Sequence, residues 1–343
     1  MHKVKEKDIW TVKYRPNTLN EICGNEESIS VIQKLIDSKN LPHLVLHGPK
    51  DSGKSSVAFA IAFELYDEYY ERNFTYFNAS DFFDQGKRYL VRDERFKRII
   101  GTDDPKKIKG SIISIFKKIL NEYSSIRPID CDYKIIFIDS AESLNSDAQH
   151  ALRRIMEKYT GTCRYILSTT QPSKLIPALR SRGVNLFFRY VSDSTLKNHI
   201  KKISNLEQLN LTDDGKNSIA YHAQGNIANA VLTLQLASLL SKDIDAQIVY
   251  ETILSKTPGE ILNLFEMLKL CDVINARIII DSLIIAKGLS GQEILEQLYG
   301  VVIESNESEM DIAKIVKRLA DIDFYLTESA NPRIQLEALI SGA

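Results

Sequence analysis

Up to about residue 188, short apolar runs alternate along the chain with longer stretches in which apolar residues recur every three or four positions. Short apolar runs bounded by polar or glycine positions are typical of buried strands, and their alternation with amphipathic helices is typical of an α/β domain with a mainly parallel sheet. Five strands are therefore expected, in HLVLHG, FTYFNAS, YKIIFIDS, RYILSTT and NLFFRY, with helices such as SSVAFAIAFELYDEYY and NSDAQHALRRIMEKY between them.

After Ser192 the pattern changes, because no further strand is expected and helical periodicity continues to the end of the chain. Residues 193–243 predict a few short amphipathic helices. Residues 243–261 carry the polar, proline and glycine positions that are typical of a domain boundary. At 343 residues the chain has room for two or three domains with sizeable cores.

Composition narrows the class of protein. With 44% hydrophobic and 26% charged residues the chain is typical of globular proteins, and no apolar run approaches the roughly 18 to 20 residues that span a bilayer. The first residues, MHKVKEKDIW, lack the apolar core of a secretory signal, so a cytoplasmic location is expected. A net charge of −1 means that any contact with DNA must come from a local basic patch.

The cysteines give no sign of a metal site. Cys23, Cys131, Cys163 and Cys271 lie more than 30 residues apart and form no C-x-x-C pair. This spacing argues against zinc and predicts reduced, mostly buried thiols.

The strongest chemical signal is HLVLHGPKDSGKSSVAFAIA, in which the pattern G-x-x-x-x-G-K-[ST] directly follows a predicted strand and opens a predicted helix. Its glycines let backbone N–H groups turn toward phosphate, Lys54 supplies positive charge near the β and γ phosphates, and Ser55 can bind Mg²⁺. ATP and Mg²⁺ are therefore the expected ligands, although Asp51 places a negative charge close to the phosphates. The expected nucleotide-binding residues of this loop are Gly48, Pro49, Lys50, Asp51, Ser52, Gly53, Lys54, Ser55 and Ser56.

Asp139 ends the predicted strand YKIIFIDS and is followed by Ser140. A lone aspartate after a buried strand is often a helix N-cap, but beside a P-loop it is expected to be the second protein ligand of Mg²⁺. ATP hydrolysis also needs a carboxylate that activates water, and a serine hydroxyl cannot accept a proton at neutral pH. The motif therefore predicts ATP binding and leaves hydrolysis in question.

Six segments, spread over almost the whole chain, resemble the small subunits of replication factor C. They are WTVKYRPNTLNEICG, HGPKDSGKSS, FNASD, SDAQHALRRIMEKY, SKLIPALRSRG and DFYLTESANPRIQLEAL. Each segment alone is a weak signal, but six in the right order are specific. The archaeal type is the most similar in length and ending, and the chain resembles a divergent paralogue with degenerate ATPase motifs.

The resemblance implies an α/β P-loop AAA+ domain with a parallel sheet over residues 1–190, a small helical lid domain over 191–245 and an all-α collar domain for oligomerisation over 246–343. It implies a hetero-pentamer with other small and large subunits that uses ATP to open a sliding clamp and load it onto primer–template DNA. It also adds Tyr14 and Arg15 to the nucleotide-binding residues. In an archaeal cell it implies a cytoplasmic, nucleoid-associated protein.

Three positions depart from the family members that hydrolyse ATP. Those members carry Asp-Glu where this chain has Asp139 and Ser140, asparagine at the position of Thr170, and arginine at the position of Ala228. The missing carboxylate is commonly worth about 10² to 10⁴ in rate, Ala228 removes a positive charge from the γ-phosphate, and Thr170 is shorter than asparagine. Relatives carry an acidic residue at Glu142 as well as the catalytic one, so Glu142 is not expected to replace it. Weak hydrolysis follows.

Arg182, in the segment SRG, corresponds through the resemblance to the arginine of a Ser-Arg-Cys motif that reaches the ATP of a neighbouring subunit. Such an arginine stabilises charge on the transferring phosphoryl group and is worth about 10³ to 10⁵ in rate. Without the resemblance, a solvated surface arginine would be the simpler interpretation. The resemblance thus predicts that this chain supplies a catalytic arginine in trans.

Contact with DNA is expected at phosphates, because a clamp loader must accept any sequence. The basic candidates are Lys174, Arg153 or Arg154, and Lys106, Lys107 and Lys109, each of which is also explained as a solvated surface charge. The stretch SIISIFKKIL falls where the family contacts the clamp. Its residues Ile112, Ile113 and Phe116 form either an apolar anchor for the clamp or the core-facing side of an amphipathic helix.

Three hypotheses about function follow. The first is a clamp-loader subunit that binds ATP, hydrolyses it weakly and donates Arg182. The second is a structural scaffold subunit of the same loader that does not cycle nucleotide. The third is an independent P-loop enzyme such as a small-molecule kinase, which no acceptor-site pattern supports and which leaves residues 246–343 unexplained.

Overall fold

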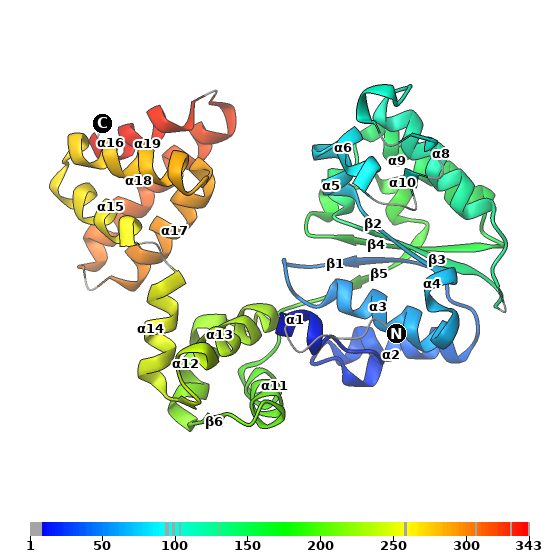
Figure 1. Cartoon of the computed structure of the whole chain (residues 1–343), viewed down its shortest axis with the longest axis horizontal. Helices are drawn as coiled ribbons and strands as arrows, with labels where there is room; N and C mark the ends of the chain where they lie inside the picture. Colours follow the sequence, from blue (N-terminus) through cyan, green and yellow to red (C-terminus); the bar gives the residue numbers. More distant parts are fainter. Residues whose placement is uncertain are drawn as a thin grey trace. The chain divides into compact units, whose positions relative to one another are not determined.

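A computed structural model describes residues 9–92, 96–97, 100–102, 104–129, 131–256, 259–305, 307–329 and 331–341. The chain divides into two compact units, the first ending at Ala246 and the second beginning at Gln247. Figure 1 traces both units by colour, from blue at the N-terminus to red at the C-terminus.

The first unit is built on a parallel sheet of five strands in the order β2-β3-β4-β1-β5 (Figure 1). The strands are β1 (His43–His47), β2 (Phe74–Asn78), β3 (Lys134–Asp139), β4 (Cys163–Thr169) and β5 (Gly183–Phe187). Each overlaps one of the five segments that the hydrophobic pattern predicts, although β4 and β5 begin one and two residues before theirs. The prediction of an α/β domain with a parallel sheet is therefore confirmed.

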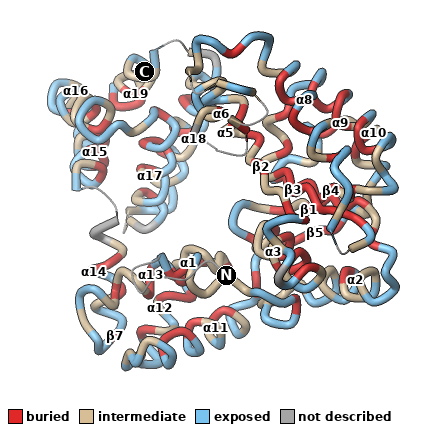
Figure 2. Tube along the Cα trace, turned by 45° about the vertical axis from the view of Figure 1, so that its right-hand side comes forward, coloured by how far each residue is buried: buried red, intermediate tan, exposed pale blue. Residues whose placement is uncertain are grey.

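Helices cover both faces of this sheet, and alternate residues of the central strands face the two layers. Ile136 and Ile138 of β3 pack in one apolar cluster, whereas Ile135 and Phe137 pack in the other. Burial on both faces explains why β3 has an unbroken apolar run, and Figure 2 shows buried residues gathered on the strands. The first cluster includes residues of α5 (Ala79–Asp84), α8 (Ile112–Ser125) and α9 (Ser146–Lys158), and the second includes residues of α2 (Glu26–Asp37) and α3 (Lys54–Tyr66).

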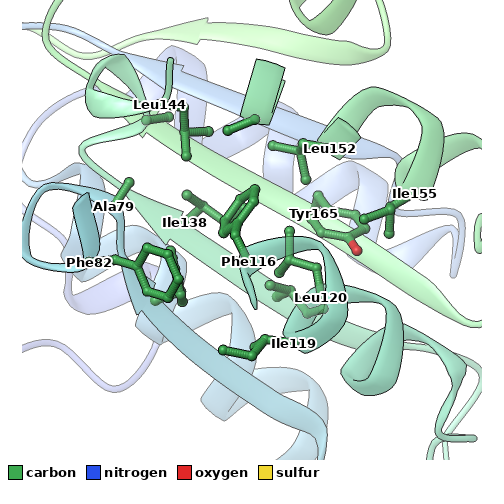
Figure 3. Packing of buried hydrophobic residues seen from close by; sticks show 14 of the residues in the cluster. Ala79, Phe82, Phe116, Ile119, Leu120, Ile138, Leu144, Leu152, Ile155 and Tyr165 are labelled. Atoms are coloured by element: carbon green, nitrogen blue, oxygen red, sulfur yellow. The ribbon is translucent and has the colours of Figure 1, made fainter. Parts of the chain in front are cut away.

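Phe116 of α8 lies inside the first cluster, where Figure 3 shows it among Phe82, Ile138 and Leu120. Its side chain is fully buried. Of the two alternatives for this helix, the core-facing side is therefore correct for Phe116, and the prediction that this ring anchors the clamp is wrong. Ile112 and Ile113, one turn earlier, are only half-buried.

Three helices follow the sheet: α11 (Asp193–Leu206), α12 (Asp213–Ala223) and α13 (Ile227–Leu240). Each begins after a polar N-cap, namely Ser192, Thr212 and Asn226, whose side-chain oxygen accepts a hydrogen bond from a backbone N–H of the first turn. These helices confirm that residues 193–243 are mainly helical; α11 is amphipathic as expected, whereas α13 is apolar around most of its circumference.

Two features of this region differ from the prediction. The strands do not end at β5, because β6 (Asn210–Leu211) pairs in parallel with β7 (Asp243–Ile244). The expected boundary over residues 243–261 does contain the division between the two units, after Ala246, but this stretch is structured and includes β7 and the helix α14 (Ala246–Lys256). A two-residue strand is too short to show any periodicity in the sequence, which is why the pattern missed both.

The N-terminal helix α1 (Trp10–Lys13) ties the start of the chain to α11 and α13. The backbone N–H of Trp10 donates to Oε1 of Gln235 at 2.9 Å, and Nζ of Lys13 lies 2.6 Å from Oε1 of Glu207. The hydroxyl of Tyr14 donates to the same carboxylate. These contacts fix the N-terminal segment beside the cavity described below.

The second unit is helical in its described residues and has its own apolar core. Its further helices are α15 (Gly259–Leu270), α16 (Val273–Asp281), η6 (Ser282–Ala286), α17 (Gly291–Glu304), α18 (Glu309–Glu328) and α19 (Pro332–Ser341). In the first unit the remaining short helices are η1 (Leu19–Glu21), η2 (Asp67–Tyr69), α4 (Tyr70–Asn73), α6 (Lys87–Arg92), η3 (Pro105–Lys107), η4 (Ala141–Ser143), η5 (Pro172–Lys174) and α10 (Pro177–Arg180). Within the described ranges, no helix has both the length and the apolar character required to span a bilayer.

Candidate nucleotide site

A cavity of about 550 Å³ lies in the first unit between the carboxyl edge of the sheet and the helices α1, α11 and α13. It opens where the chain leaves β1, β3 and β4, which is the edge at which open α/β sheets bind ligands. The P-loop supplies one wall, and the lining also includes Tyr14, Arg15, Asp139, Ser140, Glu142, Thr170 and Ala228.

The path of the P-loop requires glycine at its first position. Gly48 has φ +152°, and a Cβ atom there would lie 1.9 Å from the backbone oxygen of Phe188. Gly53, with φ +92°, is also in the left-handed region and directly precedes α3. The loop therefore places the N-terminus of the 13-residue helix α3 at the cavity, where its backbone N–H groups favour anions.

Lys54 is held inside this loop. Its Nζ donates to the backbone oxygens of Gly48 at 3.0 Å and Pro49 at 2.5 Å, and to Oγ of Ser52 at 3.3 Å. Burial lowers the pKa of Lys54, while the charge of Asp139 opposes this shift. A phosphate would give this ammonium group a charged acceptor, which forms stronger hydrogen bonds than neutral carbonyl oxygens do.

Ser55 and Asp139 are brought together as the sequence predicts. Oγ of Ser55 donates to Oδ2 of Asp139 at 2.9 Å, and Oδ1 of Asp139 accepts from the amide of Ser140 at 3.0 Å. The N-cap of the next helix, η4, is Ser140 and not Asp139. Hydroxyl and carboxylate oxygens suit Mg²⁺, which usually completes its shell with water and substrate phosphates.

Ser55 and Asp139 are the protein oxygens expected at the Mg²⁺ position. In the part of the chain that the structure covers, no group of three or more His, Cys, Asp or Glu side chains could hold a metal ion. The donor set of Ser55 and Asp139 therefore fits Mg²⁺ bound together with a nucleotide better than a metal held by protein alone.

Glu142 and Thr170 form a pair that sequence reasoning did not connect. Oε1 of Glu142 accepts from the backbone N–H of Thr170 at 3.1 Å and from its Oγ1 at 2.6 Å. Burial alone would raise the pKa of Glu142, but these hydrogen bonds, with others from nearby groups, hold it below 4.5. Glu142 is thus an ionised carboxylate at neutral pH, and its Oε1 accepts two hydrogen bonds from Thr170.

Among the other predicted nucleotide residues, the cavity lining includes Lys50, Asp51, Gly53, Ser56, Tyr14 and Arg15, but not Gly48, Pro49 or Ser52. Tyr14 and Arg15 contribute from the segment after α1, and the guanidinium carbon of Arg15 lies 4.6 Å from the ring centroid of Phe59. Ala228 lies in the first turn of α13 and brings no charge to the cavity.

Arg182 and the basic DNA candidates lie outside the cavity lining. The guanidinium group of Arg182 forms an ion pair with Glu157 of α9 and keeps 38% of its side chain exposed. Arg153 is also committed to Glu157, at 3.4 Å. Lys174 in η5 and Lys107 in η3 are exposed.

A second pair that the sequence did not reveal is formed by Cys23 and His199, which are 176 positions apart. Sγ of Cys23 lies 3.0 Å from Nδ1 of His199, and both residues line the cavity. The prediction of mostly buried thiols is wrong: Cys163 is buried, Cys23 and Cys131 are half-buried, and Cys271 is exposed. Cavities are lined by residues distant in sequence, so spacing alone gave no signal for this pair.

The fold and the site define the class of protein, a P-loop nucleotide-binding protein with an AAA domain. The family model described as "ATPase family associated with various cellular activities (AAA)" matches residues 44–190. The model described as "Replication factor C C-terminal domain" matches residues 257–342. Both structural units thus carry a recognised domain.

Full-length comparisons narrow this class to one family. The chain is 34% identical to the replication factor C small subunit of Methanocella arvoryzae, over 98% of this chain and 96% of that protein. It is 35% identical to the replication factor C small subunit of Methanosarcina acetivorans, over 99% of this chain and 95% of that protein. The chain belongs to the replication factor C small subunit family.

Solved structures support the fold. The Thermotoga maritima RuvB Holliday junction branch migration motor matches with a TM-score of 0.54 over 83% of this chain and 85% of that chain. Its sequence identity is 19%, so the likeness concerns the fold alone.

Proposed function

We propose that this chain is a clamp-loader subunit that binds ATP with Mg²⁺, hydrolyses it weakly and donates Arg182 to the ATP site of a neighbouring subunit. One observation carries the proposal. A P-loop that contains Lys54, with Ser55 hydrogen-bonded to Asp139, faces a cavity in which the position after Asp139 is a serine. Nucleotide binding needs the first set of groups, whereas water activation needs a carboxylate at the second.

The proposal assigns a role to each departure from the hydrolysing pattern. Ser140 cannot act as a base at neutral pH. Thr170 is occupied with Glu142, and Ala228 leaves the cavity without the positive charge that would face the γ-phosphate. In this proposal, the residues that bind ATP are retained, while the three positions that would support hydrolysis by this chain are altered.

The first prediction concerns binding and turnover by the isolated chain. Calorimetry with Mg–ATP should show binding that Lys54→Ala abolishes, because the ammonium group is the main cation of the P-loop. Lys34→Ala, an exposed lysine on α2, is the matched control and should bind normally. Turnover should lie about 10² or more below that of a family member with Asp-Glu in this motif.

Two outcomes would contradict this prediction. Turnover equal to that of a family member with the complete motif would reject weak hydrolysis. A chain that folds normally but does not bind ATP would favour the alternative of a structural scaffold subunit that does not cycle nucleotide. Ser140→Glu alone should restore little turnover, because Ala228 still brings no charge.

The proposal includes the assembly and its domains. An AAA+ domain over residues 1–190, a helical lid over 191–245 and a collar over 246–343 would place the nucleotide between the first two and subunit contacts on the third. The proposed partners are the other small and large subunits in a hetero-pentamer, the sliding clamp and primer–template DNA. Family membership and the C-terminal domain match support this assignment.

The second prediction concerns DNA. Lys174 and Lys107 are exposed and available to DNA, whereas Arg153 is half-buried and paired with Glu157. In the assembled loader, Lys174→Ala should weaken DNA binding equally for all sequences and flatten the slope of log K against log salt by about one unit. Unchanged affinity and slope would remove Lys174 from the DNA contact.

A further inference from the structure

A second cavity, of about 560 Å³, lies between α8 and α9 and shares no lining residue with the nucleotide cavity. The two helices lie side by side in Figures 1 and 2. Their carboxyl ends meet, because Oγ1 of Thr162, just after α9, donates to the backbone oxygen of Ser124 at 3.1 Å. Ala151 and Ile155 in the lining are buried, whereas the charged side chains of the lining are exposed. The cavity is therefore a surface groove that runs along two parallel helices.

The groove contains an excess of cationic groups. Its lining includes Lys117 of α8 and Arg154 and Lys158 of α9, against one carboxylate, Asp147. None of the three cations forms an ion pair within the part of the chain that the structure describes. The helix dipole favours Lys158 in the last turn of α9, but it does not explain Lys117 or Arg154, which lie further from the helix ends. In a chain of net charge −1, this local excess indicates an anionic partner.

The basic residues of α9 form a row with a regular spacing. His150, Arg154 and Lys158 lie at intervals of four residues, which places them on one face of the helix with a rise of about 6 Å between neighbours. Side chains on one side of an extended chain recur every two residues, or about 6.6 Å. Over two intervals the difference is only about 1 Å, which long, flexible side chains absorb. A row of anions on an extended chain would therefore meet all three residues in register.

The shape and the lining of the groove favour a peptide over a nucleic acid. Packed helices have axes about 8 to 10 Å apart, which is too narrow for a duplex whose major groove alone is about 12 Å wide. Single-stranded nucleic acid is held by bases that stack on aromatic side chains, and the lining has no aromatic ring except the imidazole of His150. A peptide needs only anions for the cations and a polar group for its backbone. Oδ1 of Asn121 supplies such a group, since Nδ2 already donates to the backbone of Lys117.

We propose that the groove between α8 and α9 binds an extended segment of a partner protein in which acidic residues alternate with neutral ones. Arg154 and Lys158 pair with carboxylates of this segment, His150 donates a hydrogen bond to another, and Lys117 approaches from α8. Asp147, one turn before His150, ends the basic row. The interaction does not depend on ATP binding, because the two cavities are lined by different residues.

Fluorescence anisotropy of the full-length chain with two labelled peptides of equal length and composition tests the proposal. In the first peptide glutamate and threonine alternate, and in the second, pairs of glutamate alternate with pairs of threonine. The alternating peptide should bind about threefold or more tightly, because it alone presents a carboxylate at every second position of one side. Its binding should weaken as salt is added. Equal affinities, or no binding of the alternating peptide, would overturn the proposal.

Substitutions test the groove itself. The groove variant, with Lys117→Ala, Arg154→Ala and Lys158→Ala, should bind the alternating peptide about tenfold or more weakly, since exposed charge pairs contribute up to about fivefold each. The control variant removes the same charge by alanine substitution of exposed lysines elsewhere in the first unit, Lys34, Lys201 and Lys202. It should bind normally, and both variants should keep the Tm of the wild type because all the positions are exposed. Equal losses in the two variants would show unspecific attraction and overturn the proposal.

Nucleic acid is the competing occupant of the groove, and the same assay with a labelled single-stranded oligothymidylate measures it. The groove variant and the control variant should bind this oligonucleotide equally. Tighter binding of the oligonucleotide than of the alternating peptide, lost in the groove variant and kept in the control variant, would overturn the peptide assignment in favour of nucleic acid.

Discussion

Thr170 donates two hydrogen bonds to Glu142, one from its backbone N–H at 3.1 Å and one from its hydroxyl at 2.6 Å. Because these bonds keep the pKa of Glu142 below 4.5 despite its burial, the ionised carboxylate stabilises the fold at neutral pH. A depressed folded-state pKa means that this stabilisation is present above the unfolded pKa and is lost as the pH falls through the folded one.

The third prediction follows from this pair. Thr170→Val removes the hydroxyl donor at nearly constant shape and should lower the free energy of unfolding at pH 7 by about 1 kcal/mol, since the contact is near solvent. Urea unfolding from pH 7 downward should show the difference between wild type and Thr170→Val shrinking below about pH 4.5. A difference that stays constant across this range would show that the ionised Glu142 is not the partner that matters.

At the residue scale, the sequence predicts those parts of the site that lie within one motif or at one strand end. Ser55 and Asp139 lie beside one another as predicted, because strand, loop and helix follow a known pattern. The pairs Glu142–Thr170 and Cys23–His199 join separate loops and helices, so only the folded chain brings them together.

At the scale of elements, α8 shows how one amphipathic helix supported two interpretations. Its buried side contains Ile115, Phe116, Ile119 and Leu120, which pack on the sheet (Figure 3 labels the last three). The half-buried Ile113 is not part of that buried set. Sequence periodicity gives the face of a helix but not what covers it.

The fourth prediction uses this difference. Phe116→Ala should lower the free energy of unfolding by about 3 to 5 kcal/mol, because it leaves a cavity in a packed aromatic cluster with Phe77 and Phe82. Ile113→Ala on the same helix should cost about 1 kcal/mol or less. Thermal unfolding of both variants measures this, and equal small losses would mean that α8 does not pack on the sheet as described.

The same scale explains which elements could be predicted. The sequence predicted all five strands of the large sheet, because burial on one or both faces produces apolar runs. The pairing of β6 with β7 and the helix α14 (Ala246–Lys256) were not predicted, because short strands and helices of mixed composition have no clear period.

At the scale of the whole molecule, the proposed function separates two sets of groups. The cavity of this chain contains the P-loop and Asp139, which are proposed to bind ATP, whereas Arg182, which is proposed to act on a neighbour, lies outside the cavity lining and is partly exposed. Arg182 is also paired with Glu157. An arginine that serves a neighbour must leave or share this ion pair, which costs little because exposed ion pairs contribute only about 0 to 1 kcal/mol.

The fifth prediction is that Arg182→Ala, introduced as the only change in the assembled loader, lowers ATPase stimulated by DNA and the clamp tenfold or more at the adjacent site. ATP binding by this chain should be unaffected, since Arg182 does not line its cavity. Glu157→Gln removes the intrachain partner but keeps the arginine, and should retain activity, which separates a trans role from a structural ion pair. Arg182→Lys should rescue only partly, because lysine lacks the planar fork that holds two phosphate oxygens. An undiminished rate in Arg182→Ala, with assembly intact, would leave the chain as a scaffold subunit.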